Sequence, residues 1–245
     1  MVANKTTKEL SAVNLIDCLM KTGLTRHESE LYVALSREGD MNGYEAAKVT
    51  GIPRANAYQA LAGLTDKGGA SMIEGQVLRY TAVPPQEYCD NVCRHMIDVL
   101  DQIKKDCPVG KIQSEPYITI TGFQHIVDKM KNIIDQAKER VYISFSETET
   151  PYVKDELLRA CERGLKVVAI TSGNLVMQGA IIHTINKRSG HVRLIADSSQ
   201  VLTGEISGRD EDTCLYSMNK PLVELIKDSL KNEIKLAKLE AETHE

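Results

Sequence analysis

Apolar residues in the first third of the chain recur every three or four positions, which is the spacing of one face of an α-helix. The pattern predicts helices at 9–21, 26–39 and 43–50, and another from Pro53 onward. Thr25 and Glu28 match the capping box T-x-x-E, which predicts the start of the second helix. Residues 70–83 differ, because apolar side chains lie on both sides of Glu74-Gly75-Gln76, and this predicts a β-hairpin. Helices joined by a tight turn and followed by a hairpin are typical of a winged helix-turn-helix.

The tight turn is centred on Gly51. Glycine readily adopts the left-handed backbone conformation that a sharp turn between two helices requires. Pro53 then begins a helix at a position where its missing N–H costs nothing. Ala57, Leu61 and Leu64 recur at helical spacing, and we expect them to pack inward.

Arg54, Asn56 and Gln59 share the outward face at the start of this helix. A helix-turn-helix places the start of its second helix in the major groove of DNA, where these residue types reach base edges. The three side chains are therefore the first candidates for DNA contact.

Three motifs carry a resemblance across residues 23–88. They are GLT..E...Y.AL...G at the start, TGIPR..AY.AL..L..KG across the turn and RY.AVPP after the hairpin. This segment closely resembles the winged-helix domain of TrmB-family transcriptional regulators, which implies a dimer that binds double-stranded DNA. The expected contacts are Arg54, Asn56, Tyr58, Gln59, Lys48, Lys67, Gln76 and Arg79. Among them, Lys48, Lys67 and Arg79 are the expected phosphate contacts, although each lysine also fits a solvated surface charge. Tyr58 fits either a phosphate contact or core packing.

A heptad pattern follows Pro84-Pro85. The apolar positions step by four and three residues, and they are Cys89, Cys93, Met96, Leu100, Ile103 and Cys107. This seam favours a linker helix that dimerises as a short coiled coil, and TrmB-like regulators carry such a helix. The alternative is a helix that lies on its own domain.

The hydrophobic pattern changes after Pro108. Short β-branched runs alternate with helical segments, which predicts an α/β domain with a mostly parallel sheet. The expected strands are 117–121, 141–146, 166–171, 191–196, 200–206 and 213–217. The expected helices are 123–138, 152–163, 174–188 and a final one with Leu222, Leu225, Ile226, Leu230 and Ile234 inward. The predicted organisation is 1–84 winged helix-turn-helix DNA-binding domain, 85–111 linker and dimerisation helix, and 112–245 α/β domain that either senses an effector or extends the dimer interface.

The second half also resembles the phospholipase-D-like domain of TrmB-family proteins, notably at RLIADSSQVLTG. Catalytic members of that fold need H-x-K-x₄-D, in which the histidine is the nucleophile. Here His191 is followed by Arg193 in place of lysine, and Asp197 comes one residue early. One residue along a strand turns a side chain to the other face. We therefore expect no catalysis, and a phosphodiesterase or nuclease is the rejected alternative.

Polar residues follow two of the predicted strands, where open α/β sheets bind small molecules. They are Ser144, Ser146, Glu147, Thr171, Ser172 and Asn174. The cluster suits a hydroxylated or anionic effector, and it equally suits helix caps. Several TrmB-like regulators sense sugars with a further C-terminal segment, for which we expect no room after the final helix.

Composition narrows the class of protein. The net charge is −4, and residues 1–85 hold nine basic and nine acidic side chains, so DNA contact must depend on local placement. The six cysteines are scattered, histidines show no metal-binding spacing, and no signal peptide or membrane-length apolar run is present. We expect a cytoplasmic regulator without metal or cofactor. A protein-interaction adaptor that kept the winged-helix shape remains the other alternative.

Overall fold

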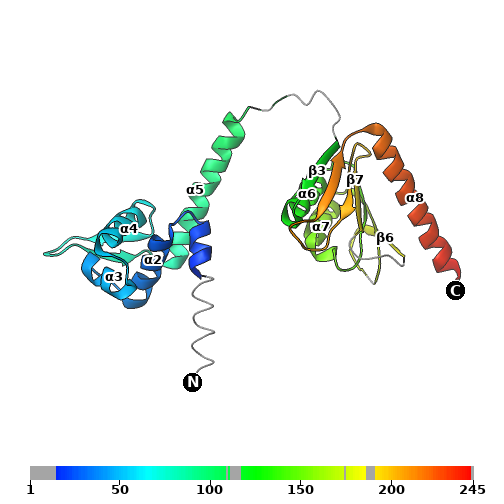
Figure 1. The fold of residues 1–245 in the computed structure, drawn as a ribbon. Helices are drawn as coiled ribbons and strands as arrows, with labels where there is room; N and C mark the ends of the chain where they lie inside the picture. Colours follow the sequence, from blue (N-terminus) through cyan, green and yellow to red (C-terminus); the bar gives the residue numbers. More distant parts are fainter. Residues whose placement is uncertain (1–14, 109, 111–116, 174, 186–190, 244–245) are drawn as a thin grey trace, which may run out of the picture. The chain divides into compact units, whose positions relative to one another are not determined.

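The computed structural model describes residues 15–108, 110, 117–173, 175–185 and 191–243. Contacts between Cα atoms divide the chain into two compact units, residues 1–109 and 110–245, which are treated separately (Figure 1). Within the described ranges, no helix is long and apolar enough to cross a membrane.

The first unit contains the expected helices and hairpin. Residues 15–21 are helical, and the rest of the predicted helix at 9–21 lies outside the described residues. The elements that follow are α2 (Arg26–Glu38), α3 (Gly43–Thr50), α4 (Arg54–Asp66), β1 (Ala70–Ile73), β2 (Arg79–Ala82) and α5 (Pro85–Asp106). The predicted capping box is present, because the Thr25 side chain accepts from the Glu28 N–H and Glu28 accepts from the Thr25 N–H.

The core of this unit lies where α2, α3 and α4 meet. Leu31 and Leu35 of α2 and Leu61 and Leu64 of α4 are almost completely buried in one cluster. Ile52, in the turn between α3 and α4, is buried in the same cluster. The inward stripe predicted from helical spacing is therefore confirmed, and it fixes which face of α4 is left outside.

The second unit is a seven-stranded mixed sheet with helices. Its elements are β3 (Tyr117–Thr121), α6 (Phe123–Gln136), β4 (Arg140–Ser144), η1 (Thr150–Tyr152), α7 (Lys154–Glu162), β5 (Lys166–Thr171), β6 (Ala180–Thr184), β7 (His191–Ala196), β8 (Gln200–Glu205), β9 (Thr213–Ser217) and α8 (Lys220–Thr243). The strand order is β3-β9-β8-β7-β4-β5-β6. Only the β4–β5 and β5–β6 pairs are parallel, and the other four are antiparallel.

Two predictions about the sheet of this unit were wrong. The sheet is not mostly parallel, because the loops joining β7, β8 and β9 are too short for the crossover that parallel strands need. The segment predicted as a helix at 174–188 contains β6 instead. Its sequence, Ala-Ile-Ile-His-Thr, is β-branched in the middle, and it pairs with β5 along its whole length.

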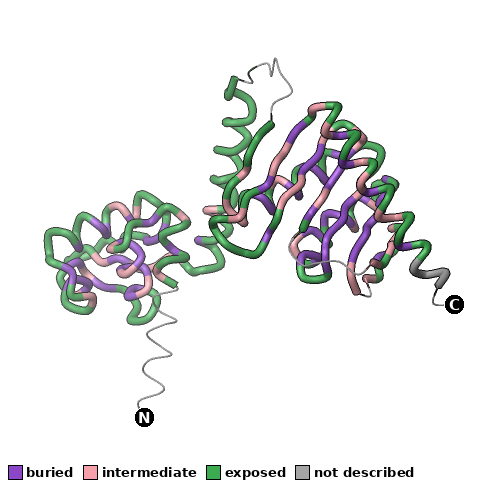
Figure 2. Tube along the Cα trace, turned by 45° about the vertical axis from the view of Figure 1, so that its right-hand side comes forward, coloured by how far each residue is buried: buried purple, intermediate pink, exposed green. Residues whose placement is uncertain are grey.

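Helices cover the two faces of the sheet unequally. Helices α6 and α7 pack on one face over the larger cluster, which includes Ile126, Met130 and Leu157. Helix α8 alone packs on the other face, with Ile226 and Leu230 against the strands (Figure 2). Leu225 was predicted to face inward, but its side chain is 65% exposed.

One buried carboxylate connects α2 to the end of α4. Glu28 is buried, accepts from the Thr25 N–H at 2.6 Å and pairs with the Lys67 ammonium at 2.7 Å. Burial alone would raise the pKa of Glu28, but the bonds from Lys67 and Thr25 outweigh it and hold the pKa below its ordinary value of 4.5. The charged form is therefore the form that the fold stabilises.

We predict that this pair makes the first unit acid-sensitive. A carboxylate whose pKa is lower in the folded chain contributes stability above its unfolded pKa, and that contribution is lost as the pH falls through the folded pKa. Lys67→Met, which leaves the carboxylate buried without its partner, should cost about 1–3 kcal/mol at neutral pH. Hydrogen exchange of the α4 amides measures the loss.

Glu28→Gln should remove the part of the acid sensitivity that lies below about pH 4.5. The control is Glu38→Gln, which changes an exposed carboxylate at the other end of α2. Equal pH profiles for Glu28→Gln and the wild type would show that the pair contributes nothing.

Candidate nucleic-acid interface

The turn between α3 and α4 has the geometry that the sequence predicted. Gly51 is left-handed, with φ 75° and ψ 4°, and its N–H donates to the Ala47 carbonyl. The Thr50 hydroxyl donates to the Ala46 carbonyl at 2.7 Å, which satisfies another carbonyl at the end of α3. Helix α4 therefore starts directly after the turn, with Pro53 preceding its first residue.

The outward face of α4 is open. Arg54, Asn56 and Gln59 are exposed, whereas Ala57 and Leu61 between and beyond them have no exposed surface. No described part of the first unit seals this face. The arrangement meets the main requirement of the DNA-binding prediction.

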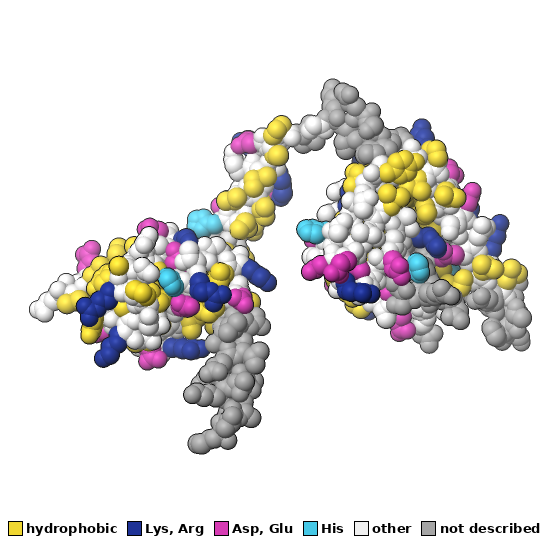
Figure 3. Space-filling view, in the orientation of Figure 1, with side chains coloured by type: hydrophobic (Ala, Val, Ile, Leu, Met, Phe, Trp, Pro, Cys, Tyr) yellow, Lys and Arg dark blue, Asp and Glu magenta, His cyan; other side chains and the backbone are white. Residues whose placement is uncertain are grey.

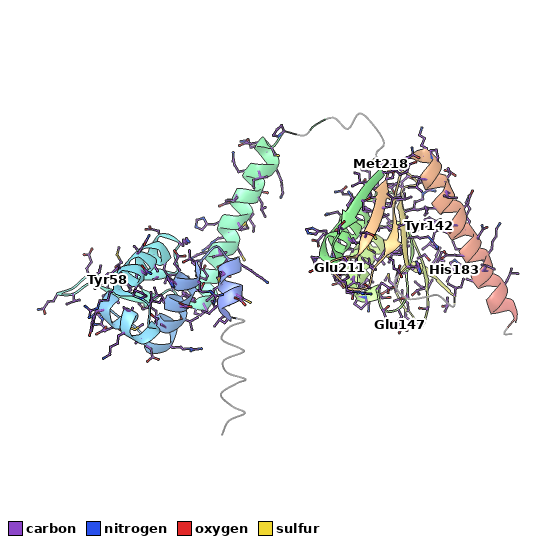
Figure 4. All side chains as sticks on the ribbon, viewed as in Figure 1. Tyr58, Tyr142, Glu147, His183, Glu211 and Met218 are labelled. Carbon is purple, nitrogen blue, oxygen red and sulfur yellow. The ribbon has the colours of Figure 1, made fainter. Side chains whose placement is uncertain are left out.

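Two aromatic contacts hold the start of α4 against α3. The Arg54 guanidinium lies 4.3 Å from the centre of the Tyr44 ring. The Tyr58 ring, labelled in Figure 4, is half exposed and lies so close to Gly43 that a side chain there would collide with it. Tyr58 is therefore not part of the buried core: its ring packs on Gly43 and leaves half of its surface to solvent, and a phosphate contact stays a prediction.

Asn56 and Gln59 lie on another part of the face. They line an open hollow together with Thr25, His27 and Ala60, so the start of α2 adjoins the start of α4. Sequence reasoning missed Tyr44 and His27 at this surface. Nothing in their local spacing signals it, because each reaches α4 only through the tertiary fold.

The three basic candidates differ in their surroundings. Lys48 is exposed near the end of α3. Lys67 instead holds Glu28 and donates to the Gly23 carbonyl at 3.0 Å. Arg79 pairs with Asp40 and, at 3.1 Å, with Glu45, and these bonds fix β2 to the start of α3. Two of the three predicted phosphate contacts are thus engaged in holding the fold together.

The wing is a short hairpin with an apolar tip. Met72 pairs with Tyr80, so Val77 and Leu78 fall in the loop and not in the second strand. Gln76 is exposed in that loop, and the apolar side chains around it are exposed too. This tip offers little positive charge to a phosphate backbone.

Helix α5 packs against the rest of the first unit at its N-terminal end, and the remainder of the helix is exposed to solvent. The Tyr88 hydroxyl bonds the Thr22 hydroxyl at 2.7 Å, and its ring packs 5.2 Å from that of Tyr32. Residues 93–106 are all exposed (Figure 2). The predicted seam is therefore exposed to solvent within this unit from residue 93 onward, and Figure 3 shows apolar side chains gathered along the helix. Its exposed members include Cys89, Cys93, Met96, Leu100, Ile103 and Cys107.

Most of the polar residues predicted as a ligand site are engaged in hydrogen bonds within the second unit. Ser144 is buried and bonds Glu233 of α8, and Ser146 is buried and bonds Glu149. Thr171 is buried, and the Ser172 hydroxyl accepts from the Glu147 N–H at 3.2 Å. Asn174 lies outside the described residues. Glu147, labelled in Figure 4, is the exposed member of the set.

The residues compared with a phosphodiesterase motif have other partners. Arg193 pairs with Glu233, and His191 is exposed at the first position of β7. The Asp197 carboxylate accepts the N–H groups of residues 138–140 at 2.9–3.0 Å. Burial pushes the pKa of Asp197 upward, but these bonds together hold the pKa below its ordinary value. Asp197 thus fastens the turn after β7. Among the described residues, no cluster of three metal-binding side chains occurs.

Comparisons with known proteins agree on one family. Residues 19–86 match the family model described as "Sugar-specific transcriptional regulator TrmB", and residues 117–228 match the N-terminal subdomain of the TrmB effector-binding domain. The uncharacterized protein YrhO of Bacillus subtilis is 26% identical over 92% of this chain and 86% of its own length.

The sugar-sensing regulator TrmBL1 of Pyrococcus furiosus is 29% identical over 59% of this chain, but the match covers only 42% of that protein. Among solved structures, the archaeal chromatin protein TrmBL2 covers 91% of this chain and 97% of its own, with 18% identity and a TM-score of 0.46. Two models of one family thus match both units, and the chain belongs to the TrmB family of DNA-binding transcriptional regulators.

Proposed function

We propose that this protein is a dimeric, cytoplasmic regulator that reads a specific DNA sequence with α4. The exposed face of α4 carries the proposal, because Arg54, Asn56 and Gln59 are free to reach base edges. Tyr58 on α4 and Lys48 near the end of α3 would supply contacts to phosphates. Residues 1–84 would thus form the DNA-binding domain.

In this proposal, Lys67 and Arg79 stabilise the fold and do not contact DNA. Each holds a carboxylate, so each positions a segment beside α4 or in the wing. Gln76 at the wing tip is a polar group that can approach the DNA backbone. Sequence readout therefore depends on a small set of side chains and not on bulk charge.

Dimerisation through α5 is the second part of the proposal. A single helix exposed along residues 93–106 is marginal in water unless its apolar face packs on something. A second copy of α5 offers the same heptad seam, and two-fold pairing lets one surface bind itself. Two recognition helices could then read half-sites about 34–36 Å apart, or a multiple of that spacing.

The third part concerns residues 112–245, which we propose as a phospholipase-D-like effector domain without catalytic activity. The pairing of Arg193 with Glu233 and the use of Asp197 in a turn support the absence of a phosphate site. An effector bound to this domain would change the spacing of the recognition helices and so the affinity for DNA.

We predict that Arg54→Ala weakens binding to DNA sites selected by the protein from a random pool. Loss of one base contact costs about 1–3 kcal/mol, or about 5- to 150-fold in affinity. Asn56→Ala and Gln59→Ala should instead relax the preference for individual bases. Fluorescence anisotropy with matched and mismatched sites measures both effects.

The matched control for that experiment is Arg37→Ala, which removes an exposed arginine from the end of α2 in the same unit. It should bind like the wild type. If Arg54→Ala also binds like the wild type, the winged helix serves as a protein-interaction adaptor and the proposal fails.

We predict that Leu100→Lys converts the dimer to a monomer, because it places a charge in the seam. Multi-angle light scattering should then give the mass of one chain, 27.2 kDa, and DNA affinity should fall together with dimerisation. Asp98→Lys is the control, since position 98 lies on the opposite side of α5. A Leu100→Lys protein that stays dimeric would place the dimer interface elsewhere.

A further inference from the structure

A cavity of about 100 Å³ lies between α8 and the sheet in the second unit. It exists because one helix, about 10 Å across, cannot cover the face of a seven-stranded sheet that is roughly 30 Å wide. Tyr142, labelled in Figure 4, lies on this side of the sheet, and its neighbour across the β4–β7 pair is Ile195.

The inner wall of the cavity is apolar. It is made by Tyr142 and Ile195 from the strands and by Leu230 and Ile234 from α8. Ile195 and Leu230 are almost fully buried in the cluster that seats α8. An apolar body of a few carbon atoms would therefore be sheltered from water here.

The remaining lining is polar and carries one sign of charge. Arg140, Lys227 and Lys231 lie around the cavity, and the Ser198 hydroxyl group belongs to the lining as well. None of the eight lining residues carries a carboxylate. A ligand that enters would thus lie on an apolar floor with three basic residues and Ser198 around it.

The acidic partners of these cations sit outside the lining. Arg140 pairs with Glu139 at 2.9 Å, and Lys227 and Lys231 pair with carboxylates three residues earlier on α8, at 3.0 and 2.9 Å. All three are surface pairs, which contribute little to stability, so a ligand anion can replace them at small cost.

We propose that this cavity binds a small organic monocarboxylate with an apolar body, such as an aromatic or branched-chain acid. The apolar group would lie against Tyr142, Ile195 and Leu230, and the carboxylate would accept hydrogen bonds from Lys227, Lys231 or Arg140. This site differs from the polar cluster at the strand ends, whose buried serines bond Glu233 and Glu149. Its regulatory role rests on the proposed function, but the binding itself does not.

The test is isothermal titration of the full-length protein with phenylacetate and 4-methylpentanoate. We expect a dissociation constant below about 1 mM for at least one of the two acids. Phenylacetamide, which lacks the charge, should bind at least about tenfold more weakly. Added salt should weaken the binding of the acids. Lys227→Gln with Lys231→Gln should weaken acid binding about tenfold or more. Lys238→Gln, which changes an exposed lysine of α8 outside the lining, should leave it unchanged.

A variant that fills the cavity tests the location. Ile195→Phe should prevent the acids from binding, and thermal unfolding checks that this variant is folded. If it is not folded, Leu230→Phe is the alternative variant that fills the cavity. The proposal would be overturned by any of three results. These are equal binding of the acid and the amide, no acid with a dissociation constant below about 1 mM, and unchanged acid binding in the charge and cavity-filling variants. Acid binding without any change in DNA affinity would support the site and refute only its regulatory role.

Discussion

The geometry of the first unit depends on the turn at Gly51. A left-handed residue at this position lets α4 leave α3 at a sharp angle while Ile52 remains in the core. The buried faces of Ala57, Leu61 and Leu64 then fix the rotation of α4 about its own axis. Because a helix has only one set of positions opposite its buried stripe, the outward position of Arg54 follows from burial and not from its own contacts.

The sequence predicted well those elements whose signals are local. The capping box at Thr25, the left-handed Gly51 and the inward stripe of α4 all depend on residues within a few positions of one another, and all are present. Strand β6 was missed because an apolar run between two strands reads as a crossover helix when no pairing partner is known. Its assignment depends on β5, which supplies the hydrogen bonds.

The candidate site was predictable only in part, for the same reason. Exposure of Arg54 follows from helical period, but the partners of Arg79 lie 39 and 34 positions earlier in the chain, at Asp40 and Glu45. From the sequence alone, a basic residue in a wing is therefore interpreted as a phosphate contact, because its carboxylate partners become known only from the fold. Tyr44 was missed likewise, since its contact with Arg54 crosses the turn.

The two faces of the C-terminal sheet differ in a way that favours the α8 side for the proposed ligand. The opposite face is covered by two helices over a large closed cluster, so ligand entry there would need the core to open. On the α8 side, Glu233 bonds Ser144 and Arg193 and holds the helix at one point. The cavity lies beside this point, along the stretch of α8 from Lys227 to Ile234. A ligand in the proposed cavity would contact both α8 and the sheet, so its binding would act on the position of α8 without breaking the sheet.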